Sequence, residues 1–298
     1  MPIFDTATAW PRRALDCLPA EESRAVLLGH PGDFEVAEAQ NAHMRAADGG
    51  LQQVDPQRAL VQWQALREAY EDIGISTYVI ESGAGLPDLC FTANPSLVLA
   101  CPALEREAWL AKMRHPSRRP ETLKHAEFHC ARGTRIREMP EHVERFEGCG
   151  DGVQHPKRFL MHAGVGPRST GEAWAYLAAA HPQLDILRYQ LVDERFYHLD
   201  TALAPLDEQT ALFVPEAFDA CGRQLVEAAF PQAIPLSLGE SLNFAGNAHC
   251  PDGKHVIIDA ACSETCAALS AAGFTPIPID TSEFRKSGGS VFCLKLAL

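Results

Sequence analysis

An apolar segment with the length and composition of a buried strand occurs five times along the chain. Most copies are followed by a stretch whose apolar residues have helical spacing, and then by a second short apolar run. A change of hydrophobic period from two residues to about 3.6 distinguishes strand from helix. The first runs of the five units are residues 24–30, 89–99, 158–164, 210–215 and 255–259.

Repetition of a strand–helix–strand unit on this scale indicates one α/β fold built from similar modules. The helical stretches are residues 61–70, 171–180, 224–230 and 264–272, while 124–139 in the second unit is rich in His and Arg and has the poorest helical pattern. The units start at uneven intervals, so the pattern predicts five modules without showing that they close into a ring. No long linker divides the 298 residues, and we expect a single domain, 1–298.

A doubly wound dinucleotide-binding fold is the competing interpretation. Its support is the pair Gly164 and Gly166 after an apolar run. The third glycine of the dinucleotide motif falls at the wrong offset, and Pro167 and Arg168 stand where the helix would begin. The modular fold is therefore the better interpretation.

Composition narrows the class of function. A net charge of −13 and a pI near 5.4 argue against nucleic acid or an anionic membrane surface as partner. No apolar run has the length of a membrane span, and the first residues lack the apolar region of a signal peptide, so we expect a cytoplasmic protein. The ten cysteines are scattered, and the spacings His249-Cys250 and Cys262 to Cys266 fit no common structural zinc site. The sequence predicts no metal and no cofactor.

Four polar clusters lie at the ends of apolar runs: residues 87–94, 146–151, 196–200 and 282–293. Loops at strand ends in a repeat fold can converge, so these clusters are candidates for one pocket. Together they supply a thiol, a histidine and several carboxylates without a metal motif. Such a set suits covalent catalysis at a planar cation, in which carboxylates hold the cation, a thiolate attacks its carbon and the histidine protonates the departing amine.

The last cluster contains the candidate nucleophile. A glycine- and serine-rich stretch leads into Val291-Phe292-Cys293-Leu294, which predicts a flexible loop passing into a buried strand, with a partly exposed thiol at the junction. Lys286 is close in sequence and is predicted to favour the thiolate. Most cysteines are small buried hydrophobic residues, so Cys293 alone proves little.

Each candidate also has a purely structural interpretation. Asp88 follows a proline and suits a turn. Glu147, beside a glycine, also suits a surface turn, and His198 suits a hydrogen-bonded core position. Asn94 precedes Pro95 and suits a strand end closed by a side-chain hydrogen bond. The joint occurrence of the clusters favours a site.

Five motifs in this order resemble those of the guanidino-group-modifying, or pentein, superfamily. They are Pro87-Asp88-x-x-Phe-Thr-Ala-Asn94, Phe146-Glu147-Gly-x-Gly-Asp151, Gly166-Pro-Arg168-Ser, Phe196-Tyr-His198-Leu-Asp200-Thr and Ser282-Glu-Phe-x-Lys-x-Gly-Gly-x-x-x-Cys293. That superfamily includes arginine deiminases, dimethylarginine dimethylaminohydrolases, arginine dihydrolases, succinylarginine dihydrolases and amidinotransferases. The resemblance runs from about residue 28 to the C-terminus and implies a five-bladed α/β propeller.

The resemblance also implies roles for nine residues. Cys293 matches the nucleophile and His198 the general acid and base. Glu147 and Asp200 match the carboxylates that hold the guanidinium, and Asp88 matches another acid that contacts the substrate. The remaining four match residues that bind substrate: Arg168 and, less closely, Arg118 for the α-carboxylate, Asn94, and Asn41 in an amino-terminal motif of the dihydrolase-like members.

Asn94 is where the chain departs from part of the superfamily. Deiminases and dimethylarginine hydrolases have an aspartate there, whereas dihydrolases resemble this chain in having asparagine. A carboxylate can only accept hydrogen bonds, but an amide also donates, so Asn94 could bind the oxygen of a ureido intermediate. This difference favours two rounds of hydrolysis over one.

The sequence therefore predicts a cofactor-independent hydrolase of the guanidino group of arginine or a close derivative, acting through a covalent thiouronium on Cys293. The prediction leans to an arginine dihydrolase releasing ornithine and ammonia, or to a deiminase releasing citrulline. The alternatives are a dimethylarginine dimethylaminohydrolase, an amidinotransferase, and a pentein-fold binding protein without turnover. The partner expected is a small guanidino molecule, and homo-oligomer formation is left open.

Overall fold

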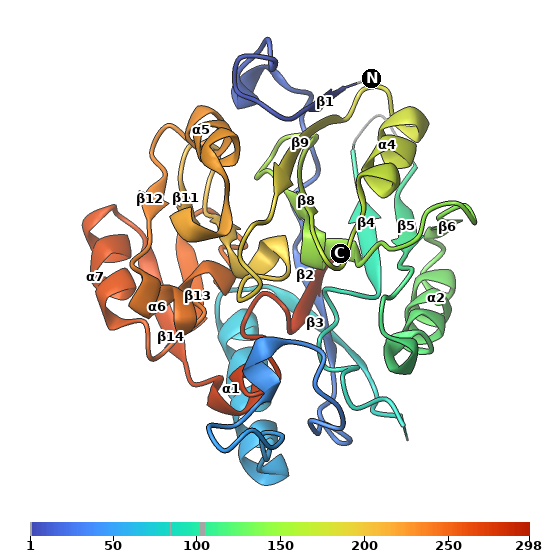
Figure 1. Cartoon of the computed structure of the whole chain (residues 1–298), viewed down its shortest axis with the longest axis vertical. Helices are drawn as coiled ribbons and strands as arrows, with labels where there is room; N and C mark the ends of the chain where they lie inside the picture. The colour runs from blue at the N-terminus through green and yellow to red at the C-terminus, as the bar shows by residue number, and fades with distance from the viewer. Residues whose placement is uncertain (1, 84, 102–104) are drawn as a thin grey trace.

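The structure is a computed structural model that describes residues 2–83, 85–101 and 105–298 (Figure 1). Within these residues the strands form five small sheets. Three of them have three strands: β15–β2–β3 (Lys295–Ala297, Ala25–Gly29, Ser76–Ile80), β4–β5–β6 (Ser96–Leu99, Glu107–Leu110, Arg135–Glu138) and β10–β11–β12 (Leu203–Pro205, Ala211–Phe213, Ile234–Pro235). The others are β1–β9–β8–β7 (Ile3–Phe4, Asp185–Gln190, Leu160–Val165, Gly152–Gln154) and β13–β14 (His255–Asp259, Thr275–Ile279).

The five sheets share one plan. In four of them an antiparallel strand (β4, β7, β10 or β15) lies beside a pair of parallel strands. In the fifth, β13 and β14 are the parallel pair, and an isolated antiparallel bridge between His249 and Ile257 takes the place of the third strand. We call these four strands and the His249 bridge the inner strands.

A helix connects the two parallel strands of every sheet, because parallel neighbours require a crossover connection. The helices are α1 (Pro56–Asp72), α2 (Glu121–Ala131), α4 (Gly171–Ala180), α5 (Ala220–Ala229) and α7 (Ser263–Ala271). All five lie around the outside of the molecule in Figure 1. The predicted α/β class and the strand–helix–strand units are thus confirmed.

Shorter helices lie between these modules or, for η2, η3 and η5, within one. They are α3 (Gly148–Asp151), α6 (Leu238–Leu242), α8 (Ser282–Arg285) and the 3₁₀ turns η1 (Ala14–Asp16), η2 (Ala42–Met44), η3 (Pro116–Arg118), η4 (Leu199–Thr201), η5 (Pro215–Ala217) and η6 (Ala245–Asn247). Among the described residues, no helix combines the length and the apolar content needed to cross a membrane.

Helix α1 illustrates how local sequence and packing agree. The Asp55 side chain accepts hydrogen bonds from the backbone N–H groups of the first turn, and proline follows it at the first helical position. The buried residues Ala59, Trp63, Leu66 and Tyr70 recur at spacings of three and four, so they form one face. That face packs in the hydrophobic cluster that also contains Cys293, so the helix supports the candidate nucleophile from outside.

The second module differs from the sequence prediction. The run 89–99 was expected to be the strand before the helix, but residues 89–95 form turns and only Ser96–Leu99 is extended. The strand that pairs in parallel with β6 is β5, which the sequence analysis did not identify. Burial on all sides explains the error, because a continuous apolar run does not distinguish turn from strand in a core.

The C-terminal segment also corrects a prediction. Residues 282–285 form the helix α8, and the glycine- and serine-rich residues 287–290 form the expected loop after it. This loop is not on the surface, because the residues from Ser287 to Leu296 are buried. Cys293 lies in the turn before β15 and is only 2% exposed, so the expected partly exposed thiol is wrong. Strand β15 pairs with β2, which places this turn beside the amino-terminal part of the fold.

Candidate active site

Five of the nine candidate residues come from turns that precede inner strands. Asn94 precedes β4, Glu147 precedes α3 and β7, and His198 and Asp200 precede β10. Cys293 precedes β15 in the same way. The sequence analysis expected convergence at strand ends, whereas the structure brings together the segments before these strands.

Cys293 is held by two polar side chains. Its Sγ lies 3.1 Å from Oδ2 of Asp200, to which the thiol donates, and 3.1 Å from Nδ2 of Asn247, which donates to the sulfur. Burial raises the pKa of Cys293 well above its ordinary value, and the negative charge of Asp200 acts in the same direction. In this structure Cys293 is therefore a thiol instead of a thiolate.

Lys286 does not serve the thiolate as predicted. Its Nζ donates to Oε2 of Glu283 at 2.6 Å and to the carbonyl of Gln53 at 2.8 Å. The lysine whose charge is felt near Cys293 is Lys295, on β15. Proximity in sequence misled here because α8 turns the Lys286 side chain toward the loop before α1.

Asp200 is a buried carboxyl group with one oxygen unused. Oδ2 accepts from Cys293, while Oδ1 has no hydrogen-bond partner among the described residues. Burial raises the pKa of Asp200 to about 7, although the hydrogen bond from Cys293 and the charge of Lys295 oppose this. A ligand N–H donor or cation would satisfy Oδ1 and favour the ionised carboxylate.

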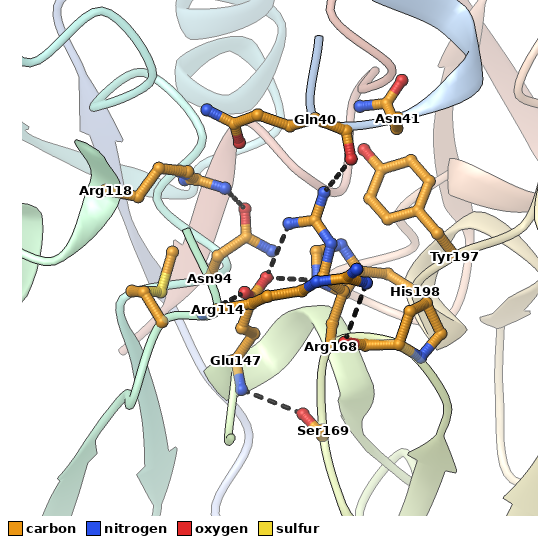
Figure 2. A network of polar contacts seen from close by, with 12 residues as sticks. Gln40, Asn41, Asn94, Arg114, Arg118, Glu147, Arg168, Ser169, Tyr197 and His198 are labelled. Atoms are coloured by element: carbon orange, nitrogen blue, oxygen red, sulfur yellow. Dashed lines mark hydrogen bonds and ion pairs between the residues drawn. The ribbon is translucent and has the colours of Figure 1, made fainter. Parts of the chain in front are cut away.

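His198 and Arg168 meet on Glu147 (Figure 2). Nε2 of His198 lies 2.8 Å from Glu147 Oε2, and Nη1 of Arg168 lies 3.0 Å from the same oxygen. Burial lowers the pKa of His198 to about 4, so the ring is neutral and Nε2–H donates to the carboxylate. Nδ1 then keeps a lone pair and has no partner in the described part of the chain, which suits a general base.

Glu147 is the most heavily engaged carboxylate of the site. Its Oε1 accepts from the backbone N–H of Arg114 at 2.9 Å, and its own N–H donates to Oγ of Ser169 at 2.9 Å. Burial would raise the pKa of Glu147, but the charge of Arg168 and the hydrogen bond from His198 outweigh it and bring the pKa below its ordinary value. Glu147 thus already binds a guanidinium, that of Arg168.

Arg168 is fixed on three sides. Besides Glu147, it donates from Nη2 to the carbonyl of Gln40 at 3.1 Å, and its guanidinium carbon lies 4.7 Å from the ring centroid of Tyr197. Figure 2 shows Arg168 between Gln40 and Glu147 with the Tyr197 ring beside it. Arg168 is buried, and its predicted role toward a substrate carboxylate stays a prediction.

Arg118 determines the orientation of Asn94. Two of its nitrogens donate to the carboxylate of Glu121 at 3.0 and 2.8 Å, and Nη1 donates to Oδ1 of Asn94 at 3.0 Å. Because an arginine can only donate, the oxygen of the Asn94 amide must face Arg118. Nδ2 of Asn94 is then buried without a partner among the described residues, so it is the free donor of the site.

Asp88 and Asn41 lie at the side of the same cavity. Asp88 accepts from Nε2 of Gln40 at 3.1 Å and from Oγ of Ser287 at 3.3 Å, and burial raises its pKa. Asn41 caps η2 and donates to the carbonyl of Ser287 at 3.0 Å. Gly288, with φ of +88°, allows this approach, because a Cβ there would lie 2.7 Å from the Asn41 amide.

A narrow cavity of about 10 Å³ lies among these groups. Its lining includes six of the nine predicted residues: Asn41, Asp88, Asn94, Arg118, Arg168 and Cys293. The remaining three, Glu147, His198 and Asp200, are hydrogen-bonded to members of that set or to each other. Within the described ranges no cluster of His, Cys, Asp or Glu is arranged to hold a metal ion.

Asn247 is the residue that the sequence analysis missed. Its Oδ1 accepts from the N–H groups of Ser290 and Cys293 at 3.0 and 3.3 Å, and its Nδ2 also donates to the carbonyl of Asp200 at 2.8 Å. It ends η6, just before the His249 bridge. The signal was available, because every other module has a polar residue before its inner strand.

Comparison with known proteins places the chain in a family. Residues 30–297 match the family model described as N,N dimethylarginine dimethylhydrolase, eukaryotic. The chain belongs to this family. The resemblance to guanidino-modifying enzymes predicted from the motifs is thereby confirmed.

Two curated relatives have different named activities. The N(G),N(G)-dimethylarginine dimethylaminohydrolase of Mycobacterium tuberculosis is 37% identical over 93% of this chain and 86% of its own length. The bifunctional arginine dihydrolase/ornithine cyclodeaminase AgrE of Nostoc is 32% identical over 91% of this chain, which spans 37% of that protein. Family membership alone therefore leaves the substrate open.

Solved structures agree with the fold. The substrate-bound N-terminal domain of ArgZ, an arginine dihydrolase from cyanobacteria, has a TM-score of 0.83 at 28% identity and covers 91% of this chain and 97% of that one. An adduct of dimethylarginine dimethylaminohydrolase with S-methyl-L-thiocitrulline has a TM-score of 0.76 at 22% identity, over 93% of this chain and all of the other. The latter shows the shared pentein fold.

The raised pKa of Asp200 predicts a pH-dependent stability difference. The carboxyl titrates at about 7 in the fold and at about 3.9 when unfolded, so its contribution is fully present below the unfolded pKa and is lost as pH rises through 7. Asp200→Asn cannot ionise. From pH 5 to pH 8 the free energy of unfolding of Asp200→Asn, measured by urea denaturation, should therefore rise by roughly 2–3 kcal/mol relative to that of the wild type. Exposed Asp72→Asn controls for the lost charge, and parallel curves for Asp200→Asn and the wild type would contradict the assignment.

The contacts of Asn247 predict that it positions and activates the sulfur. Asn247→Ser should make alkylation of Cys293 by iodoacetamide slower by roughly threefold to tenfold, because the thiolate loses a hydrogen-bond donor. Peptide-resolved mass spectrometry over a pH series measures this rate. A purely structural residue gives the opposite result, since a loosened turn exposes the sulfur. Asn243→Ser, which loses a contact with Arg285, is the matched control.

Proposed function

We propose that the chain is a cofactor-independent guanidino hydrolase that converts arginine to ornithine, ammonia and carbon dioxide, as an arginine dihydrolase. We further propose that its five sheets are the blades of a five-bladed α/β propeller, forming one domain over residues 1–298. The observation that carries the choice of reaction is the free amide nitrogen of Asn94 in the cavity with Cys293.

Substrate binding in this proposal is an exchange of guanidinium groups. Glu147 already holds the guanidinium of Arg168, and a substrate guanidinium has the same charge and the same planar set of donors. The substrate replaces Arg168 on Glu147 and also donates to the unused Oδ1 of Asp200. The released Arg168 then pairs with the substrate α-carboxylate. Exchange of one ion pair for another avoids leaving a buried charge unpaired.

The bound cation activates the nucleophile. Cys293 is a thiol in this structure, and a positive charge beside it lowers its pKa. The thiolate attacks the guanidinium carbon, and a C–S bond forms. The thiol proton reaches Nδ1 of His198, a buried base without a partner among the described residues, and passes to the departing nitrogen as the C–N bond breaks. Ammonia leaves, and a thiouronium remains on the sulfur.

Water resolves the adduct in the second half of the reaction. His198 accepts a proton from the water, which adds to the thiouronium carbon, and the C–S bond breaks to give citrulline. Nδ2 of Asn94 donates to the ureido oxygen, so citrulline is held and polarised for attack. A second cycle, on citrulline, releases ammonia and the carbamate of ornithine. This carbamate decomposes to ornithine and carbon dioxide. An aspartate at position 94 would repel that oxygen.

Dimethylarginine hydrolysis is the second candidate function. The matched family model and the 37% identical mycobacterial relative favour it. The same thiol, histidine and carboxylates would then release dimethylamine and stop at citrulline. The two candidates differ in the fate of citrulline, which only a dihydrolase consumes.

The first test of this proposal is a product analysis. The purified chain is incubated separately with arginine, citrulline and asymmetric dimethylarginine, and products are identified by mass spectrometry. We expect ornithine from both arginine and citrulline, and no product with Cys293→Ser. Citrulline and dimethylamine from dimethylarginine, with citrulline left unconsumed, would support the second candidate instead.

Asn94→Asp should separate the two cycles in the same assay. The added carboxylate attracts a guanidinium but repels the ureido oxygen, so arginine should be converted to citrulline and ornithine formation should fall by roughly 100-fold or more. Asn243→Asp adds the same charge outside the cavity and should leave the product ratio unchanged. An unchanged ratio in Asn94→Asp would assign Asn94 to a structural role.

The proposed exchange also predicts selectivity for amino-acid substrates. Agmatine has the guanidinium of arginine but no carboxylate, so it cannot pair with the released Arg168. Its kcat/KM should be lower than that of arginine by roughly 100-fold, and Arg168→Lys should narrow the difference, because lysine gives no bidentate pair. Equal kcat/KM for both substrates in the wild type would leave Arg168 as a structural partner of Glu147.

A further inference from the structure

A second cavity, with a volume of about 180 Å³, lies apart from the candidate active site. The two cavities share no lining residue. Asn94 and Cys293, in the first cavity, precede inner strands, whereas Leu97, Val153, Pro205, Cys250 and Lys295, in the second, lie within or after them. Cys149 and Phe292 also line the second cavity from the segments before β7 and β15. The inner strands therefore separate the two cavities, and the turn with Cys293 lies between them.

Lys295 is the buried cation of this cavity. The residue is only 2% exposed, and its Nζ lies 3.2 Å from the ring centroid of Phe292. Among the described residues its amine has neither a hydrogen bond nor an ion pair, so the aromatic face is the contact that stabilises its charge. Burial lowers its pKa to about 8, and the neighbouring Cys149 and Asp200 oppose that shift, so the amine is mostly charged at neutral pH.

The carboxylates at the edge of this cavity are already engaged. Glu21 pairs with Arg106 at 2.7 Å, Glu22 with Lys157 at 3.6 Å and Glu208 with Arg158 at 2.6 Å. Asp207 accepts from the backbone N–H groups of Gln209 and Thr210 at 2.8 and 2.7 Å. The walls nearer to Lys295 are apolar, with Val26 and Val98 among them. A buried cation without a counter-ion is unfavourable. When one partner of a buried ion pair is removed, the charge that remains strongly destabilises the fold.

We propose that this cavity binds a compact carboxylate with an apolar body. The carboxylate would pair with Lys295, and the body would displace water from the apolar walls. Arg106 and Lys157 also line the cavity, but each is paired with a glutamate. Lys295 is therefore the unpaired cation among the described lining residues, and it selects a monoanion over a phosphate or a polyanion, which would bring a second charge without a partner. The lining uses none of the residues proposed for the guanidino reaction, although the charge of Lys295 also acts on Asp200 and Cys293.

Calorimetric titration with phenylacetate and its neutral isostere phenylacetamide tests this site on the wild-type chain. We expect phenylacetate to bind about tenfold or more tightly than phenylacetamide, because only the carboxylate pairs with Lys295. Equal affinity for the two probes, or no binding of phenylacetate, would overturn the proposal. This comparison needs no variant and so does not depend on the folding of one.

Two variants locate the binding. Lys295→Met keeps the length and the apolar stem of the side chain and should abolish the preference for phenylacetate, whereas Lys157→Met, at a paired and half-exposed lysine, should retain it. Arg168→Lys separates this site from the active-site cavity, and the preference should survive there too. A preference that persists in Lys295→Met, or disappears in Arg168→Lys, would overturn the proposal.

Discussion

The pairing of buried charge is the constraint on which the rest of this site depends. Arg168 neutralises Glu147, and Arg118 neutralises Glu121 and lies 4.0 Å from Asp88. Each guanidinium is held by a carboxylate at hydrogen-bond distance. Asp200 differs, because among the described residues the hydrogen bond to its carboxyl group comes from the thiol of Cys293 and no guanidinium contacts it. Asp200 is therefore the carboxyl group of the site that has no cation in contact with it. A guanidino substrate would supply that cation.

The repeated architecture explains how residues far apart in sequence meet. Each module begins with a polar turn, continues into an inner strand and then passes outward through the parallel pair and its helix. Five turns at equivalent places contribute Asn94, Glu147, His198, Asn247 and Cys293. Because the strands behind these turns are buried, the turns are rigid. Substitution in one module then alters one chemical role without dismantling the others.

Much of this arrangement followed from the sequence, and the failures have physical reasons. The helices 171–180 and 264–272 were predicted within one residue of α4 and α7, because their apolar periodicity reflects one buried face. The exposure of Cys293 and the direction of Lys286 depend on α8, whose tertiary packing no local pattern encodes. The motifs identified the nine candidate residues, yet Asn247 escaped because a Gly-Asn-Ala segment is unremarkable without the modules to which it belongs.

The state of the thiol connects these observations into one mechanism. A permanently ionised Cys293 beside Asp200 would bring two negative charges into a buried site without a cation in contact. Protonation of the sulfur avoids this, and the proton is shared with Oδ2 of Asp200. Burial has a second effect when a guanidinium enters. Because charges interact more strongly in a low-dielectric interior, the guanidinium is attracted more strongly to the sulfur of Cys293 and to the carboxylate of Asp200. In the proposed mechanism, burial thus restricts thiolate formation to the substrate-bound site and protects the proposed nucleophile of a chain with ten cysteines from other reactions.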